Sequence, residues 1–161
     1  MRSNPETFEA ILLTPFAALG IRTGDDRVEE IVFLPSRGSA LAPRNRLAER
    51  VCAQIERYVG DPGYRFDLPV GARGTKFQHR VWRRIAAIGA GHTRSYGEIA
   101  RELASSPRAV GQACGANPLP LIVPCHRVLA AGGIGGFAHH RGGFPLSVKR
   151  WLLAHEGVAA P

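Results

Sequence analysis

Cys125 and His126 are neighbours in the sequence and are the two residues best suited to covalent chemistry. A cysteine is a strong nucleophile only as the thiolate, and since its ordinary pKa is about 8.5 it needs a base or a positive neighbour at neutral pH. In an extended segment adjacent side chains point to opposite faces, so His126 would reach the thiol only through a turn or a bridging water. Pro124, which ends the apolar run of residues 119–123, favours such a turn.

A second interpretation of this pair stays open at this point. Lone cysteines are among the most buried residue types, so Cys125 could be a structural core residue beside a histidine that caps a helix. The choice depends on the segments that would have to position the pair.

The composition limits the classes of protein and site that are possible. The chain has 161 residues, enough for one domain or two small ones, and its three cysteines include no C-x-x-C pair. We therefore expect neither a disulfide framework nor a cofactor, and no metal, because Cys114, Cys125, His139 and His140 are spaced irregularly for zinc. The absence of a signal pattern and of a membrane-length apolar stretch predicts a cytoplasmic protein without membrane contact.

Positive charge is concentrated in the C-terminal half. The formal net charge is +8; residues 1–72 hold 9 Lys and Arg against 10 Asp and Glu, or −1, whereas residues 73–161 hold 12 against 3, or +9. A basic module beside a near-neutral one indicates a polyanionic partner, with nucleic acid as the first choice. The alternative is an arginine-rich surface that serves solubility.

The N-terminal half has the pattern of a small sheet with one helix. Short β-prone runs predict strands over residues 8–13, 17–22 and 28–33, helical spacing predicts a helix over 47–59, and residues 66–70 suggest another strand. Glycines at 71–74 mark a boundary. We predict an α/β (α+β) fold in which residues 1–72 form a scaffold domain packed on a mainly helical domain of residues 73–161.

The C-terminal half contains a predicted helix-turn-helix. Thr75 can cap a first helix, Ser95 and Glu98 form a capping box for a second, and Ser106 followed by Pro107 starts a third. The third helix would bury Val110, Ala113 and Cys114 and present a basic, small and polar face. That face consists of Arg108, Gly111, Gln112 and Gly115.

Four motifs then follow in an order that closely resembles the O6-alkylguanine-DNA alkyltransferases, also called methylated-DNA–protein-cysteine methyltransferases. They are Arg108-Ala109-Val110-Gly111, Asn117-Pro118, Pro124-Cys125-His126-Arg127-Val128 and the stretch 149–157. The resemblance covers about residues 75–157. It implies a DNA repair protein that flips O6-alkylguanine, and O4-alkylthymine, out of double-stranded DNA and transfers the alkyl group irreversibly to Cys125.

The resemblance also implies roles for individual residues. Glu156 would hydrogen-bond His126, which through a water would take the proton of Cys125, while Arg127 would support the framework. Arg108 would fill the place of the flipped nucleotide, and Asn117 would tie the helix-turn-helix to the active-site segment. The minor-groove surface of a monomer would comprise Ser95, Arg108, Ala109, Gly111, Gln112 and Gly115, and the alkyl pocket would comprise Tyr96, Pro124, Val128 and Phe137, with Tyr96 also donating a proton to the leaving guanine.

The sequence departs from the family pattern in two places. The turn between Leu103 and Arg108 is shorter than usual, and the link over residues 137–147 is longer and has Phe137 where a tyrosine is common. We expect this link to form one wall of the alkyl pocket.

Two other classes of protein remain possible at this point. A cysteine hydrolase would turn over many times, and a DNA-binding regulator would not react at all.

Overall fold

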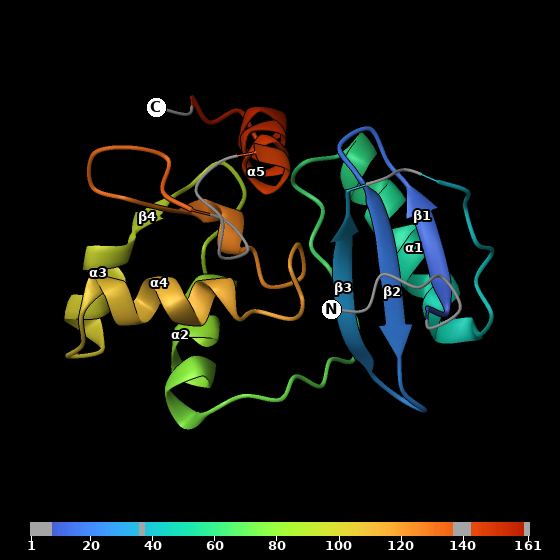
Figure 1. Ribbon diagram of the computed structural model, residues 1–161, viewed down its shortest axis with the longest axis horizontal. Coiled ribbons are helices and arrows are strands. Elements are labelled where there is room, and N and C mark those ends of the chain that lie inside the picture. Colours follow the sequence, from blue (N-terminus) through green and yellow to red (C-terminus); the bar gives the residue numbers. More distant parts are fainter. Residues whose placement is uncertain (1–7, 36–37, 137–142, 160–161) are drawn as a thin grey trace. The chain divides into compact units, whose positions relative to one another are not determined.

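The structure, a computed structural model, describes residues 8–35, 38–136 and 143–159 and is drawn in Figure 1. The chain divides into two compact units, Met1–Ala72 and Arg73–Pro161. Helices and antiparallel strands are both present, so the predicted α/β (α+β) class is confirmed. In the described ranges no helix has the length and apolar character needed to cross a membrane.

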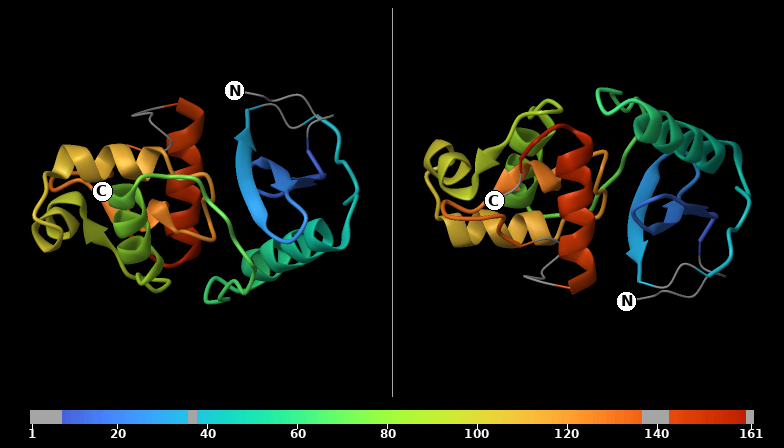
Figure 2. Two further views of the ribbon diagram at one scale, coloured as in Figure 1. Left: turned by 90° about the horizontal axis from the view of Figure 1, so that it is seen from below. Right: turned by 90° about the horizontal axis from the view of Figure 1, so that it is seen from above.

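The first unit is a three-stranded sheet with one helix. Strands β1 (Ala10–Leu13), β2 (Ala18–Thr23) and β3 (Val28–Leu34) pair antiparallel in the order β1-β2-β3. Helix α1 (Arg46–Gly60) lies across one face of this sheet in the views of Figures 1 and 2. Residues that alternate along the strands therefore meet the apolar stripe of the helix, and the buried core includes Leu19, Ile21, Val51 and Ile55.

The predicted strand over residues 66–70 is wrong. Only Val70 pairs with the sheet, through an isolated bridge to Val28. Pro69 has no N–H to donate to a ladder, and the N–H of Asp67 donates instead to the side chain of Gln54, at 2.9 Å. A β-prone composition therefore gives an irregular segment, because these backbone groups are occupied elsewhere.

The second unit begins with helix α2 (Lys76–Ala86), which the predicted Thr75 cap opens in a capping box with Gln78. The helix buries Val81, Trp82 and Ile85. The indole N–H of Trp82 donates to the carbonyl oxygen of Ala113 at 2.8 Å, in helix α4. This buried hydrogen bond fixes α2 against α4.

The predicted helix-turn-helix is present. Strand β4 (Arg94–Ser95) leads through the Ser95–Glu98 capping box into α3 (Tyr96–Glu102), and Ser106 caps α4 (Pro107–Gly115). The turn between them is short because Ala104 takes a left-handed conformation with φ 54°, which lets the N–H of Ser105 reach the carbonyl of Ala100 at 2.9 Å.

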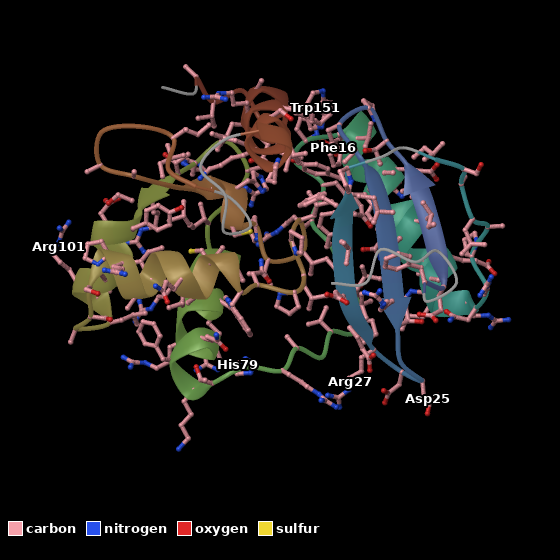
Figure 3. All side chains as sticks on the ribbon, in the orientation of Figure 1. Phe16, Asp25, Arg27, His79, Arg101 and Trp151 are labelled. Carbon is pink, nitrogen blue, oxygen red and sulfur yellow. The ribbon has the colours of Figure 1, made fainter. Side chains whose placement is uncertain are left out.

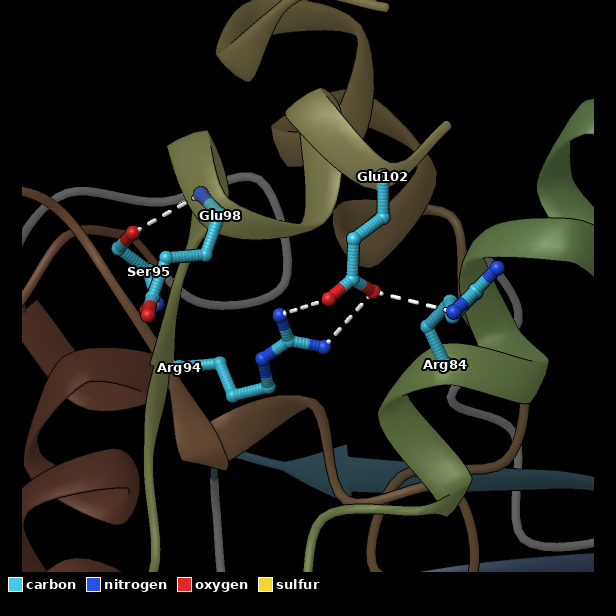
Figure 4. Close-up of polar contacts among 5 residues, drawn as sticks. All are labelled: Arg84, Arg94, Ser95, Glu98 and Glu102. Carbon is cyan, nitrogen blue, oxygen red and sulfur yellow. Dashed lines mark hydrogen bonds and ion pairs between the residues drawn. The ribbon is translucent and has the colours of Figure 1, made fainter. Parts of the chain in front are cut away.

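An exposed ion-pair cluster ties α3 to its neighbours (Figure 4). Glu102 of α3 accepts two hydrogen bonds from the guanidinium of Arg94, in β4, and one at 3.1 Å from Arg84 of α2. A shared carboxylate with two guanidinium partners fixes three elements at one point, although each exposed pair contributes little free energy alone.

The active-site segment follows α4 and ends in helix α5. Residues Cys125–Arg127 form a single 3-10 turn, after which β5 (Val128–Leu129) pairs in parallel with β4. Helix α5 spans Gly143–His155, so residues 143–147, which we assigned to the link over residues 137–147, belong to the helix instead. Pro145 fits the first turn of a helix, where its missing N–H costs nothing. Residues 137–142 of the expected loop lie outside the described residues.

Replacing Trp82 with phenylalanine should lower the free energy of unfolding by about 1–2 kcal/mol. The phenyl ring keeps most of the apolar contact but leaves the buried carbonyl of Ala113 without its donor. Urea denaturation of the variant measures the loss. An unchanged midpoint would show that this hydrogen bond does not hold α2 to α4.

Candidate active site

A buried carboxylate lies at the centre of the site. Oε2 of Glu156 is 2.8 Å from Nε2 of His126, and Arg127 donates to both oxygens, from Nε to Oε1 at 2.8 Å and from Nη2 to Oε2 at 2.9 Å. The side chains of Glu156 and His126 are 0% and 1% exposed. Arg127 also donates to the carbonyl of Ile88, at 2.6 Å. The negative charge of Glu156 is thus compensated by the guanidinium of Arg127 and by a hydrogen bond from His126.

Glu156 occupies this place because α5 ends there. Gly157 has φ 79°, and the N–H of Val158 bonds back to the carbonyl of Leu153 at 2.9 Å, so the helix stops in a left-handed turn. A carboxylate at a helix C-terminus is unfavourable in the field of the helix dipole. The contacts of His126 and Arg127 outweigh that cost.

The same contacts fix the tautomer of His126. An ionised carboxylate can only accept, so Nε2 carries the hydrogen and Nδ1 has a free lone pair. Burial lowers the pKa of His126 more than the bond to Glu156 raises it, so the ring is neutral at pH 7. Nδ1 is buried and has no hydrogen-bond partner among the described residues. The ring therefore presents an unprotonated nitrogen that can accept a proton.

Cys125 is held at the start of the 3-10 turn. Its N–H donates to the carbonyl of Val123 at 2.8 Å, and its side chain is largely buried, with the residue 6% exposed. Burial raises the pKa of the thiol, while the Asn117 side chain and the charge of Lys149 act in the opposite direction. At neutral pH the resting form is the thiol, so a base must remove its proton when it reacts.

Lys149 is a residue of this site that sequence reasoning missed. It is 0% exposed, and its Nζ donates to the carbonyls of Val128 at 2.8 Å and Gly136 at 2.9 Å. Burial lowers the pKa of Lys149 from 10.5 to about 8, while Cys125 and Cys114 raise it. Both cysteines are therefore close enough to interact with the charge of Lys149. A signal was available in the sequence: Lys149 lies three residues before Leu152 and four before Leu153, so it falls on the apolar stripe of its helix, where a lysine is expected to be buried.

Tyr96 and the backbone of Gly135 and Gly136 form one side of the site. The Tyr96 hydroxyl donates to the carbonyl of Gly136 at 3.3 Å, and Lys149 Nζ lies 5.9 Å from the ring centre. Gly135 has φ 76°, and a Cβ there would lie 2.9 Å from the Tyr96 ring, so only glycine fits. Of the other predicted pocket residues, Pro124 and Val128 are buried, and Phe137 lies outside the described residues.

Asn117 connects the helix-turn-helix to the active-site segment. Its Nδ2 donates to the carbonyl of Val123 at 2.9 Å, and its Oδ1 accepts from the N–H of Leu119 at 2.9 Å. The C-cap of α4 is Ala116, so Asn117 is not the cap of that helix. It instead shapes the chain between α4 and Cys125.

The predicted DNA-binding residues share one surface of α4. Arg108 and Gln112 are exposed, Ala109, Gly111 and Gly115 are half-buried, and the opposite face buries Val110, Ala113 and Cys114. Ser95 is half-buried at the start of α3. Arg101 projects outward from α3 (Figure 3). The described residues contain no group of three or more His, Cys, Asp or Glu that could hold a metal.

The fold and the site together define a class of protein. Its reactive group is a buried thiol with a histidine base next to it in the sequence, and the same unit contains a helix-turn-helix. The family model for the DNA-binding domain of 6-O-methylguanine DNA methyltransferase matches residues 76–158. The chain is 35% identical over 142 residues to the methylated-DNA–protein-cysteine methyltransferase of Methanosarcina mazei, covering 83% of this chain and 87% of that protein. It is 43% identical to that of Mycolicibacterium paratuberculosis, covering 84% and 80%.

A solved structure agrees with these relatives. The Mycobacterium tuberculosis protein OGT in complex with DNA matches with a TM-score of 0.73 and 34% identity, covering 91% of this chain and 90% of that one. This chain belongs to the family of methylated-DNA–protein-cysteine methyltransferases.

Replacing Lys149 with methionine should raise the pKa of the Cys125 thiol by about 1 or more, because a nearby positive charge favours the thiolate. The rate at which iodoacetamide labels Cys125 as a function of pH, read by peptide mass, measures this change. Lys149→Arg retains the charge and should keep the pKa closer to that of the original protein. An unchanged titration in Lys149→Met would show that Lys149 only holds the two carbonyls.

Proposed function

We propose that this chain repairs DNA by flipping O6-alkylguanine, and also O4-alkylthymine, out of the duplex and transferring the alkyl group irreversibly to its own Cys125. It would act once as a methylated-DNA–[protein]-cysteine S-methyltransferase. The observation that supports this most directly is the buried bond between Nε2 of His126 and Glu156 beside Cys125, at 2.8 Å. It gives the thiol a neutral base whose second nitrogen can accept a proton.

The proposed reaction moves two protons and one alkyl group. Nδ1 of His126 takes the proton of Cys125 through a water, and Glu156 and Arg127 hold the ring while it is charged. The charge of Lys149 favours the thiolate, which attacks the alkyl carbon in line. The carbon–oxygen bond breaks, its electron pair leaves with guanine, and Tyr96 donates a proton to the base. A thioether has no partner to resolve it, so the protein is consumed.

The proposed DNA contact is the minor groove. Helix α4 would enter it, with Arg108 filling the place of the flipped nucleotide and the small residues Gly111 and Gly115 allowing close approach. Gln112, Ala109 and Ser95 would complete the surface. A DNA partner is supported by the Mycobacterium tuberculosis relative, which was solved in complex with DNA.

We assign these tasks to the unit of residues 73–161 and a scaffold role to residues 1–72. The protein would act as a monomer, without a cofactor, in the cytoplasm. The three free cysteines at positions 52, 114 and 125 support a reducing compartment.

After incubation with a duplex that contains O6-methylguanine, each molecule should gain one methyl group, on Cys125 alone. Burial raises the pKa of Cys114, and that of Cys52 to about 11. Unlike Cys125, neither is followed in the sequence by a histidine that could act as a base, so we expect neither to react. Intact mass followed by peptide mapping measures this, with Cys125→Ala and Cys52→Ala as matched variants. Repeated turnover would favour a hydrolase, and no transfer would favour a DNA-binding regulator.

Arg108→Ala should slow transfer from a duplex at least about tenfold more than transfer from free O6-benzylguanine, because only the duplex substrate must be unstacked at a cost of a few kcal/mol. Single-turnover rates on both substrates measure the ratio. Arg101→Ala removes another exposed arginine, from α3, and serves as the control. Equal losses on the two substrates would mean that Arg108 has only a structural role.

A further inference from the structure

Three basic residues of α2 form an exposed line that the proposed reaction does not use. Lys76, Arg80 and Arg83 are four and three residues apart, so they lie on one face of the helix, and all three are exposed. The opposite face buries Val81, Trp82 and Ile85. We refer to Lys76, Arg80 and Arg83 as the α2 cationic row.

The row is not neutralised within the part of the chain that the structure describes. Helix α2 contains no acidic residue, and across the described ranges no Asp or Glu forms an ion pair with Lys76, Arg80 or Arg83. The next basic residue, Arg84, differs, because it pairs with Glu102 at 3.1 Å. Like charges three and four residues apart on a helix repel one another, so this row mildly opposes the folding of α2.

The row has a fixed position relative to the helix that we expect to enter DNA. The bond from Trp82 to the Ala113 carbonyl, at 2.8 Å, joins the buried face of α2 to α4. Arg84 and Glu102 further join α2 to α3. When α4 contacts a duplex, the α2 cationic row therefore stands at a set distance from the same duplex.

The spacing of the row suits a nucleic-acid backbone. At a rise of about 1.5 Å per residue, the seven steps from Lys76 to Arg83 span about 10 Å along the helix axis. One strand of duplex DNA carries a charge every 3.4 Å or so along its axis, so this span corresponds to about three phosphates. Flexible basic side chains on one face can each reach one of them.

Resting on the proposed function, we propose that the α2 cationic row binds the phosphate backbone of the duplex outside the alkylated nucleotide. It is a second contact, on α2 and separate from the α4 surface. Because phosphates carry no sequence information, this contact adds affinity for any duplex and places α4 along the groove without selecting the damaged base. Its contribution is a release of counterions, so it depends strongly on salt.

The test is the salt dependence of binding to a lesion-free duplex by the full chain. Each phosphate contact contributes about 0.9 to the slope of log K against log salt, so Lys76→Gln, Arg80→Gln and Arg83→Gln together should reduce that slope by about 2–3. At 0.1 M salt the affinity should fall by on the order of 100-fold. A duplex with O6-methylguanine should show the same reduction.

The matched control removes three exposed arginines of the first unit, by Arg44→Gln, Arg46→Gln and Arg65→Gln. Both triple variants lose the same net charge, so a general effect of charge would reduce the two slopes equally and would overturn the proposal. An unchanged slope in the α2 variant would overturn it as well. Thermal unfolding of each variant distinguishes a misfolded protein from one that has lost only its DNA contact. If the triple variant does not fold, single substitutions replace it, and each should lower the slope by about 0.9.

This experiment is separable from the test of the proposed function. If the α2 cationic row is shown not to bind the phosphate backbone, methyl transfer to Cys125 in the original protein is still expected. If the proposed function fails, no alkyl group reaches Cys125, whatever the slope of DNA binding.

Discussion

The buried carboxylate of Glu156 is the interaction on which the site depends. It lies at the end of α5, accepts from His126 and Arg127, and through Arg127 reaches the Ile88 carbonyl beyond the end of α2. One carboxylate thus fixes the helix end, the 3-10 turn and the tautomer of the histidine. Removing a partner from such a buried charge costs several kcal/mol, so geometry and protonation are fixed together.

Burial also sets the chemistry of the thiol. It raises the pKa of Cys125 and lowers the pKa values of His126 and Lys149, so water exclusion favours the neutral forms of all three groups. A resting thiol beside a neutral base is protected from adventitious reaction. In the proposed mechanism it becomes a thiolate only when the base takes its proton, with the charge of Lys149 nearby.

Among the described residues of the second unit, the buried charged groups are compensated by close partners, whereas many of the exposed ones are not. The interior holds a few compensated charges around Glu156, whereas the surface of α2 and α4 carries arginines and a lysine with few carboxylates. The Trp82 bond and the Glu102 cluster join the surface elements to one another, and Asn117 joins the end of α4 to the segment that carries Cys125.

The sequence by itself determined the elements whose signals are local. The caps at Thr75, Ser95 and Ser106 predicted three helix starts, because a side chain that satisfies a nearby N–H acts within one turn. The motif around Cys125 indicated the family, which the comparisons confirmed. Local pattern also misled, since residues 66–70 are β-prone but the N–H of Asp67 donates to a side chain, and Pro145 lies in α5 rather than in the expected link.

The resemblance led us to expect Glu156 beside His126, but only the tertiary structure decided which other charges meet. Arg127 and Glu156 are 29 residues apart, and no periodicity relates them. Lys149 was not among the site residues expected from the sequence, yet the fold buries it, and its Nζ donates to the carbonyls of Val128 and Gly136. Burial and long-range partners set the pKa of every reactive group, and both depend on segments distant in the sequence. Residue types could therefore name the nucleophile and the base, whereas packing determined their protonation.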